Sequence, residues 1–102
     1  MTKKKKSYKS AKPFFDELRK DPEVMLHYEE EKAKTQIAAL VRAARQRAGM
    51  TQAELAEKVG TTQSVIARLE SGGDQRTPSL ALLARIASAL DARLEFGFKF
   101  AG

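Results

Sequence analysis

The chain has 102 residues and a formal net charge of +6, which suits one small domain with extensions rather than several domains. It contains no cysteine, so disulfide bonds and thiolate metal sites are excluded. No apolar run approaches the length of a membrane span, and the basic start lacks the apolar stretch of a secretory signal. We therefore expect a cytoplasmic protein with no membrane partner.

The positive charge is concentrated at the start of the chain. Six lysines precede Asp16, the first acidic residue, and together they equal the whole net charge: Lys3, Lys4, Lys5, Lys6, Lys9 and Lys12. Residues 1–12 are predicted to form a disordered, solvated arm, with nonspecific contact to DNA phosphates as the alternative. In neither case does the arm read a DNA sequence.

An acidic segment with many apolar side chains follows, and residues 13–34 are predicted to form an N-terminal helical extension. Asp21 followed by Pro22 is typical of a helix cap with proline at the first helical position. We expect a partner to bury the apolar and aromatic side chains of this segment, namely Phe14, Phe15, Leu18, Val24, Met25 and Tyr28. Helical spacing continues to Gly49, but Thr35 could cap a fresh helix, so whether residues 22–48 form one helix or two stays open.

The stretch from Thr51 to Gly72 predicts two helices joined by a tight turn. Thr51 and Glu54 form a capping-box pattern at the start of the first helix. Gly60 supplies a residue that tolerates positive φ at the turn, and Thr62 is a suitable cap for the second helix. Apolar side chains at helical spacing should face inward, namely Leu55, Ala56, Val59, Ile66 and Leu69. This is the geometry of a helix-turn-helix DNA reader.

The outward face of the second predicted helix carries side chains that suit base edges. Gln63 could pair with adenine and Arg68 with guanine. Thr62 and Ser64 lie on the same face. Arg76, in the loop that follows, is a candidate phosphate contact, although solvated surface charge explains it equally well. The alternative is that the two helices only pack against each other and do not bind DNA.

These residues resemble the motif of the Cro/repressor (Xre) family, in the order Gln52, Leu55-Ala56, Gly60, Ile66 and Leu69-Glu70. The resemblance covers roughly residues 40–90 and implies a mainly α fold with five short helices that binds double-stranded operator DNA. It further implies base contacts from Gln63, Ser64 and Arg68, and backbone contacts from Gln52 and Thr62. Arg45 and Glu70 match positions that form a structural ion pair in many relatives. The helix-turn-helix domain is expected over residues 35–91.

A different periodicity ends the chain. After a helix that opens at Ser79, residues 92–102 are predicted to form one β-strand, because apolar Leu94, Phe96, Phe98 and Phe100 alternate with polar or small residues. A lone strand needs a partner, and the same strand of a second subunit would make a twofold homodimer. A tail that folds back on its own domain is the alternative.

The front segment, the motif and the terminal strand together resemble HigA-type antitoxins. That resemblance implies a bacterial repressor that neutralises a basic RelE/HigB-like ribonuclease toxin and controls its own operon. A free-standing phage-like or chromosomal repressor is the second interpretation, and an adaptor without DNA binding is a third. His27, the single histidine, could pair with Glu23 or Glu31. We expect no enzyme activity, no cofactor and no metal site, because no catalytic or ligand pattern is present.

Overall fold

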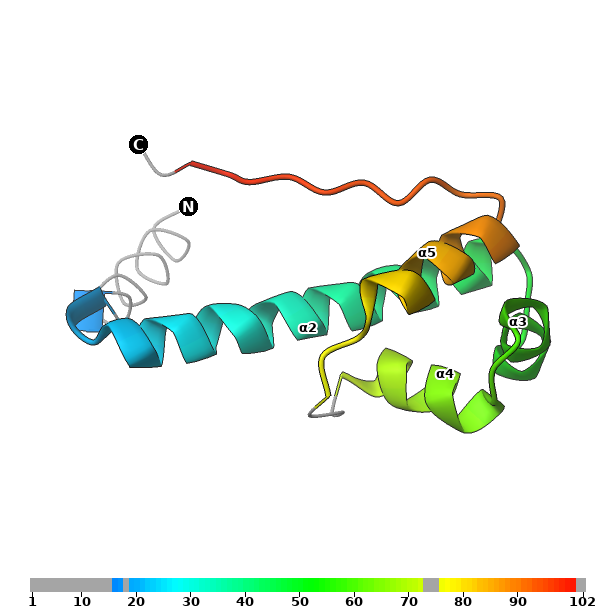
Figure 1. Ribbon diagram of the computed structural model, residues 1–102, viewed down its shortest axis with the longest axis horizontal. Helices are drawn as coiled ribbons and strands as arrows, with labels where there is room; N and C mark the ends of the chain where they lie inside the picture. Colours follow the sequence, from blue (N-terminus) through cyan, green and yellow to red (C-terminus); the bar gives the residue numbers. More distant parts are fainter. Residues whose placement is uncertain (1–15, 18, 73–75, 101–102) are drawn as a thin grey trace, which may run out of the picture. The chain divides into compact units, whose positions relative to one another are not determined.

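A computed structural model describes residues 16–17, 19–72 and 76–100 of the chain. The predicted basic arm, residues 1–12, lies outside this part, as do Phe14, Phe15 and Leu18. The chain divides into two compact units, Met1–Ala33 and Lys34–Gly102, which are described separately. The helices are α2 (Pro22–Arg47), α3 (Gln52–Val59), α4 (Gln63–Ser71) and α5 (Leu80–Ala89) (Figure 1).

Helix α2 is one continuous helix, which answers the question that the sequence left open. The carboxylate of Asp21 accepts a hydrogen bond from the backbone N–H of Glu23 at 3.0 Å, and Pro22 is the first helical residue. The predicted cap is therefore confirmed. Thr35 lies inside the helix and starts no new one, because the i to i+4 backbone ladder continues past it.

The second unit has its core where the end of α2 meets α3, α4 and α5. Leu55 and Ile66 have no exposed surface, and Ala56, Val59 and Leu69 are buried beside them, as the sequence predicts. Val41 of α2 and Leu83 and Ile86 of α5 complete the cluster. Half-buried Ile37, Met50, Leu82, Ala89, Leu90 and Leu94 pack around it. Helix α3 packs against both α4 and α5, so the core fixes the position of the two motif helices.

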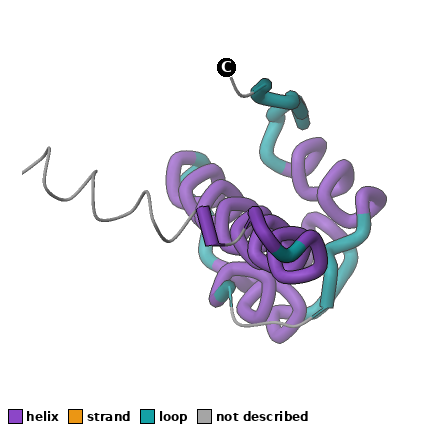
Figure 2. The backbone as a smooth tube through the Cα atoms, turned by 90° about the vertical axis from the view of Figure 1, so that its left-hand side faces the viewer, coloured by secondary structure: helices purple, strands orange, loops and turns teal. Residues whose placement is uncertain are grey.

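The described residues are mainly helical, with four helices and no strand (Figure 2). The predicted fifth helix and the predicted C-terminal strand are thus not confirmed. Residues 92–100 leave the end of α5 as extended chain. A strand is defined by backbone hydrogen bonds to a second strand, and the described part of this single chain offers no second strand. None of the described helices is both long and apolar enough to cross a membrane.

Candidate nucleic-acid interface

Helices α3 and α4 begin and end at the residues that the sequence predicts. The Oγ1 atom of Thr51 accepts a hydrogen bond from the N–H of Glu54 at 3.1 Å, and the N–H of Thr51 donates to the Glu54 carboxylate at 2.8 Å. This is a complete capping box. The N–H of Val65 donates to the Oγ1 of Thr62 at 3.3 Å, which caps α4. Both caps satisfy amides that a helix start would otherwise leave without a partner.

The turn between the two helices is held from both sides. Gly60 has a φ of +82° and closes α3 by donating its N–H to the carbonyl oxygens of Ala56 and Glu57 at 2.9 and 3.2 Å. The Nη2 atom of Arg85, on α5, donates to the carbonyl oxygens of Val59 at 2.6 Å and Gly60 at 3.3 Å. Its positive charge lies at the carbonyl end of α3, where a cation is favourable. Arg85 therefore ties the turn to the rest of the domain.

Sequence reasoning missed this role of Arg85. The arginine lies 25 residues away from Gly60 along the chain, and its spacing relative to the apolar residues of α5 marks it only as a surface position. A helix whose last carbonyls need a donor is a general signal for a basic side chain nearby. That signal does not say which arginine supplies the donor.

The outer face of α4 presents its polar side chains to solvent. Thr62, Gln63, Ser64 and Arg68 are all exposed. Ile66 and Leu69 on the opposite side are buried, so the orientation of the helix about its own axis is fixed by the core. The structure thus brings the three predicted base-contacting side chains, Gln63, Ser64 and Arg68, to one exposed face. That face begins at a capped helix N-terminus, where backbone amides favour negatively charged groups such as phosphate.

Arg45 and Glu70 form the predicted ion pair, and the pair is nearly buried. The guanidinium Nε and Nη2 atoms of Arg45 donate to the two carboxylate oxygens of Glu70 at 2.7 and 3.0 Å. Only 12% of the Arg45 side chain and 3% of the Glu70 side chain are exposed. The Nη1 atom of Arg45 also donates to the carbonyl oxygen of Met50 at 2.7 Å. One arginine thereby joins α2, the approach to α3 and the end of α4.

Gln52 belongs to the same network. Its amide nitrogen donates to the carboxylate of Glu70 at 3.2 Å, and its side chain is half-buried. The predicted backbone contacts thus have different surroundings: Gln52 is oriented by Glu70, whereas Thr62 and Arg76 are exposed. A glutamine amide has two N–H donors, so one remains for a phosphate oxygen while the other bonds to Glu70.

The network keeps Glu70 charged. Burial raises the pKa of Glu70, but hydrogen bonds from Arg45 and Gln52 and the positive charges of Arg45 and Arg42 outweigh burial, so the pKa lies below its ordinary value. The hydrogen bond to Glu70 raises the pKa of Arg45 against the opposing effect of its burial. At the start of α3, the backbone and side-chain hydrogen bonds of Thr51 lower the pKa of Glu54. Charged Glu70 is therefore a fixed part of the motif at neutral pH.

The front unit holds the described members of the predicted partner surface. Val24 has an exposed fraction of 46%, and Met25 and Tyr28 are half-buried. Leu26, next to them in sequence, is 71% exposed. Three glutamates on the same helix, Glu29, Glu30 and Glu31, are exposed as well. This part of α2 combines exposed apolar side chains with negative charge.

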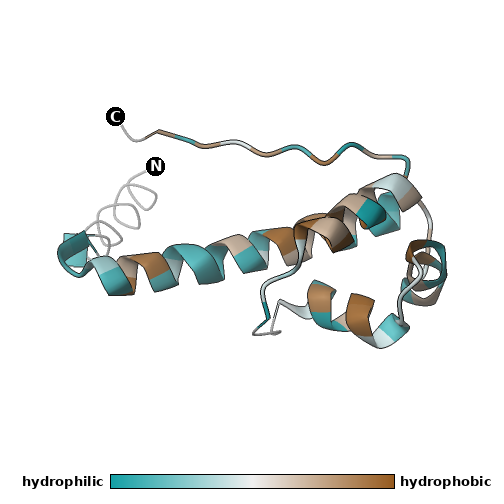
Figure 3. Cartoon of the chain, viewed as in Figure 1, coloured by the Kyte–Doolittle hydropathy of each residue, from teal (hydrophilic) through white to brown (hydrophobic). Residues whose placement is uncertain are grey.

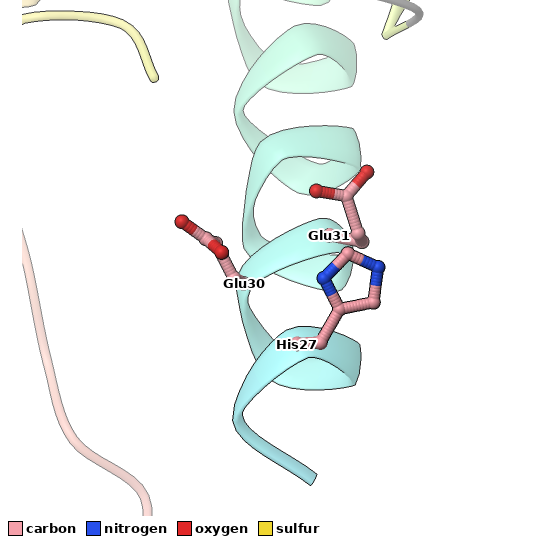
Figure 4. A group of neighbouring side chains, drawn as sticks. All are labelled: His27, Glu30 and Glu31. Atoms are coloured by element: carbon pink, nitrogen blue, oxygen red, sulfur yellow. The ribbon is translucent and has the colours of Figure 1, made fainter. Parts of the chain in front are cut away.

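His27, Glu30 and Glu31 form the one group of possible metal ligands among the described residues, with ligand atoms within 4.8 Å of one another (Figure 4). All three side chains are exposed on α2. Spacings of three and four residues bring side chains together on any helix surface. No buried donor completes the group in the described part of the chain, so we assign it no metal.

The geometry of the motif agrees with comparisons to known proteins. The model of a family described as helix-turn-helix matches residues 41–96, more than half of the chain. The chain therefore belongs to this helix-turn-helix family. It is similar to an uncharacterized HTH-type transcriptional regulator from Methanothermobacter thermautotrophicus, with 51% identity over 51 residues, or 50% of this chain and 71% of that protein.

A second relative extends the similarity slightly. It is an uncharacterized HTH-type transcriptional regulator from Archaeoglobus fulgidus, 45% identical over 60 residues, which cover 59% of this chain and 83% of that protein. Both relatives are archaeal, so the expectation of a bacterial source has no support from them.

Proposed function

We propose that this chain is a non-catalytic, sequence-specific transcriptional repressor that binds double-stranded operator DNA as a homodimer. The observation that carries the proposal is the exposed face of α4, where Gln63, Ser64 and Arg68 stand on a helix that is capped, buried on its other side and fixed by the Arg45–Glu70 pair. Side chains held rigidly on one face are what readout of base edges in the major groove requires. The names of the two relatives, both HTH-type transcriptional regulators, support the regulatory part of this proposal.

Selection from a random pool of double-stranded DNA tests the proposal without knowledge of the operator. The wild-type chain should enrich one sequence. If the homodimer binds two half-sites, that sequence should contain an inverted repeat. The double variant Gln63→Ala, Arg68→Ala should enrich none, while its weak nonspecific binding persists at low salt. The double variant Lys32→Ala, Gln36→Ala removes similar chemistry from exposed positions of α2 and is the matched control. Enrichment of the same sequence by the Gln63, Arg68 variant would overturn the assignment.

A finer proposal is that the repressor is the antitoxin of a type II toxin-antitoxin pair, with a basic RelE/HigB-like toxin as its partner. Its support is the front part of α2, where exposed Val24 and Leu26 lie among glutamates. A negatively charged helix that also exposes apolar side chains suits a basic partner. A free-standing repressor without a toxin remains the alternative, because the DNA-binding half is the same in both.

Coexpression with a small basic protein encoded beside this gene distinguishes the antitoxin from the free-standing repressor. The double variant Val24→Asp, Leu26→Asp should lose copurification of that protein and keep DNA binding. Leu80→Asp changes a side chain that is 62% exposed on α5, so it serves as the control. A complex that survives the double change, or the lack of any complex with the wild-type chain, would count against the antitoxin.

A further inference from the structure

The C-terminal segment, residues 92–100, is an extended chain with one exposed apolar face. Asp91 has a φ of +55°, and the N–H of Ala92 donates to the carbonyl oxygen of Ala87 at 2.8 Å, so the chain leaves the helical conformation at the end of α5. Three aromatic side chains beyond it are largely exposed: Phe96 at 72%, Phe98 at 93% and Phe100 at 88%. Figure 3 shows the alternation of hydrophobic and hydrophilic residues along this segment.

An apolar groove adjoins the start of the segment. It has a volume of about 290 Å³ and lies between the end of α2, α5 and the first residues of the segment, including Leu40, Leu83, Leu90 and Leu94. Leu40 is 69% exposed although it lies beside the core residue Val41. Leu94 is half-buried against the core, so the apolar face of the extended segment and the groove form one continuous surface.

We propose that two copies of the chain pair antiparallel through residues 94–100, with the twofold axis at Gly97. This inference rests on the proposed homodimer and specifies its register. Side chains alternate between the two faces of a strand, and directly opposite residues share a face. A twofold pairing that keeps the apolar residues on one face must therefore be centred on a residue and not between two residues.

Charge selects Gly97 among the possible centres. With the axis at Gly97, Glu95 lies opposite the partner's Lys99, and the same pair recurs on the other side of the axis. Phe96 then lies opposite the partner's Phe98, and Gly97 faces its own copy without any side chain. Opposite charges across a strand pair stabilise it, and like charges destabilise it.

Other positions of the twofold axis give less favourable pairings. An axis at Phe96 places Arg93 opposite the partner's Lys99, and an axis at Glu95 places two glutamates face to face. An axis at Phe98 places no positively charged residue directly opposite Glu95. An axis at Leu94 also pairs Arg93 with Glu95 twice, but it sets residues 97–100 opposite residues 88–91, where α5 ends, so Phe98 and Phe100 find no partner strand. Among axes at residues 95–99, only Gly97 forms two complementary charge pairs and no like-charge pair within residues 93–99.

The same register fills the groove. The partner's Phe100 lies opposite Leu94, which lines the groove beside α5. The aromatic side chain at the end of one strand thus covers the apolar surface at the start of the other. The backbone hydrogen bonds that a single extended segment lacks are supplied by the second copy. This arrangement explains why the phenylalanines and Leu40 are exposed in the single chain: the second copy covers them.

Charge reversal in the full-length protein tests the register by analytical ultracentrifugation. Glu95→Lys and Lys99→Glu should each weaken dimerisation about tenfold or more, because each replaces two attractive pairs by two repulsive ones. The double variant Glu95→Lys, Lys99→Glu should restore wild-type affinity. Circular dichroism checks that the helices remain. A wild-type chain that stays monomeric overturns the homodimer itself, whereas a dimeric wild type whose double variant is not restored overturns only the register.

Cysteine cross-linking gives an independent measurement. Gly97→Cys should form a disulfide-linked dimer in mild oxidant, because directly opposite Cα atoms lie about 4.5–5.5 Å apart. Glu95→Cys is the control: in this register the two introduced thiols lie about 14 Å apart along the strands. Efficient cross-linking through position 95, or through Phe96→Cys but not Gly97→Cys, would replace the proposed axis by another.

Discussion

The α3–α4 pair and the C-terminal segment are both amphipathic, but only the pair is complete within the described chain. Leu55 and Ile66 have no exposed surface, whereas Phe98 is 93% exposed. Helices satisfy their own backbone hydrogen bonds and need a neighbour only for their apolar side. An extended segment needs a neighbour for its backbone as well. The comparison teaches that the two motif helices are stabilised within one chain, whereas the terminal segment has no partner for its backbone or its apolar face in the described residues.

The largest expected effect concerns the core of the pair. Ile66→Ala should lower the free energy of unfolding by about 2–5 kcal/mol, because it removes buried methyl groups and leaves a cavity. Phe98→Ala removes a larger side chain from the segment and should change the stability of the monomer by less than about 0.5 kcal/mol. Urea denaturation at low protein concentration measures both. A comparable loss for Phe98→Ala would show that the segment packs on its own subunit and would erase the contrast.

The second largest loss of stability is expected when the buried Arg45–Glu70 ion pair is broken. Arg45→Met should cost about 3 kcal/mol, because it leaves the nearly buried carboxylate of Glu70 without its main partner. The double variant Arg45→Met, Glu70→Leu should cost less than the single one, since no unpaired charge remains. Thermal unfolding of the wild type, the two single variants Arg45→Met and Glu70→Leu, and the double variant forms a double-mutant cycle. Equal losses for the single and the double variant would mean that the packing of Arg45, rather than its charge, stabilises the motif.

Acid should destabilise the α3–α4 pair through Glu70 more than through Glu54. The pKa of Glu70 is lower in the folded chain than its ordinary value of 4.5. The carboxylate therefore contributes stability that is fully present above pH 4.5 and is lost as the pH falls through the folded pKa. Glu70→Gln should weaken this acid dependence of the unfolding free energy. Glu54→Gln should weaken it less, because the Glu54 carboxylate is exposed to water. An unchanged acid profile in Glu70→Gln would contradict the role given to the network.

Within the α3–α4 pair, the smallest loss of stability is expected at the helix cap. Thr51→Ala removes the side chain that accepts from Glu54 and should cost about 1 kcal/mol. Thr51→Ser keeps the acceptor and should cost only a few tenths of a kcal/mol. Hydrogen exchange of the first amides of α3 is the direct measurement, since these amides should lose protection in the alanine variant alone. Equal protection in both variants would place the origin of the helix start elsewhere.

Local patterns predicted much of the motif. Thr51 with Glu54, Gly60, Thr62 and Gly72 fixed where α3 and α4 begin and end, because caps and positive-φ glycines act through bonds only a few residues apart. The buried positions Leu55 and Ile66 followed from helical spacing for the same reason. Arg45 and Glu70 were placed by resemblance to a family and not by spacing. The contacts of Gln63, Ser64 and Arg68 with DNA stay predictions.

Other features depended on distant parts of the chain. The continuity of α2 past Thr35 was undecided, since a threonine inside a helix and a threonine at a cap look alike in sequence. The donation from Arg85 to Val59 and Gly60 joins residues that are far apart along the chain. The predicted strand was not found in the described residues, because an alternating pattern specifies an extended chain but cannot supply the second strand.

The sequence by itself thus determined the helix ends, the buried faces of α3 and α4 and the extended character of the last described residues, all of which arise from interactions between near neighbours. The tertiary structure decided how Glu70 orients Gln52 and which arginine holds the turn. These features depend on contacts across 18 to 26 residues of chain, and such contacts form only when the core brings the helices together.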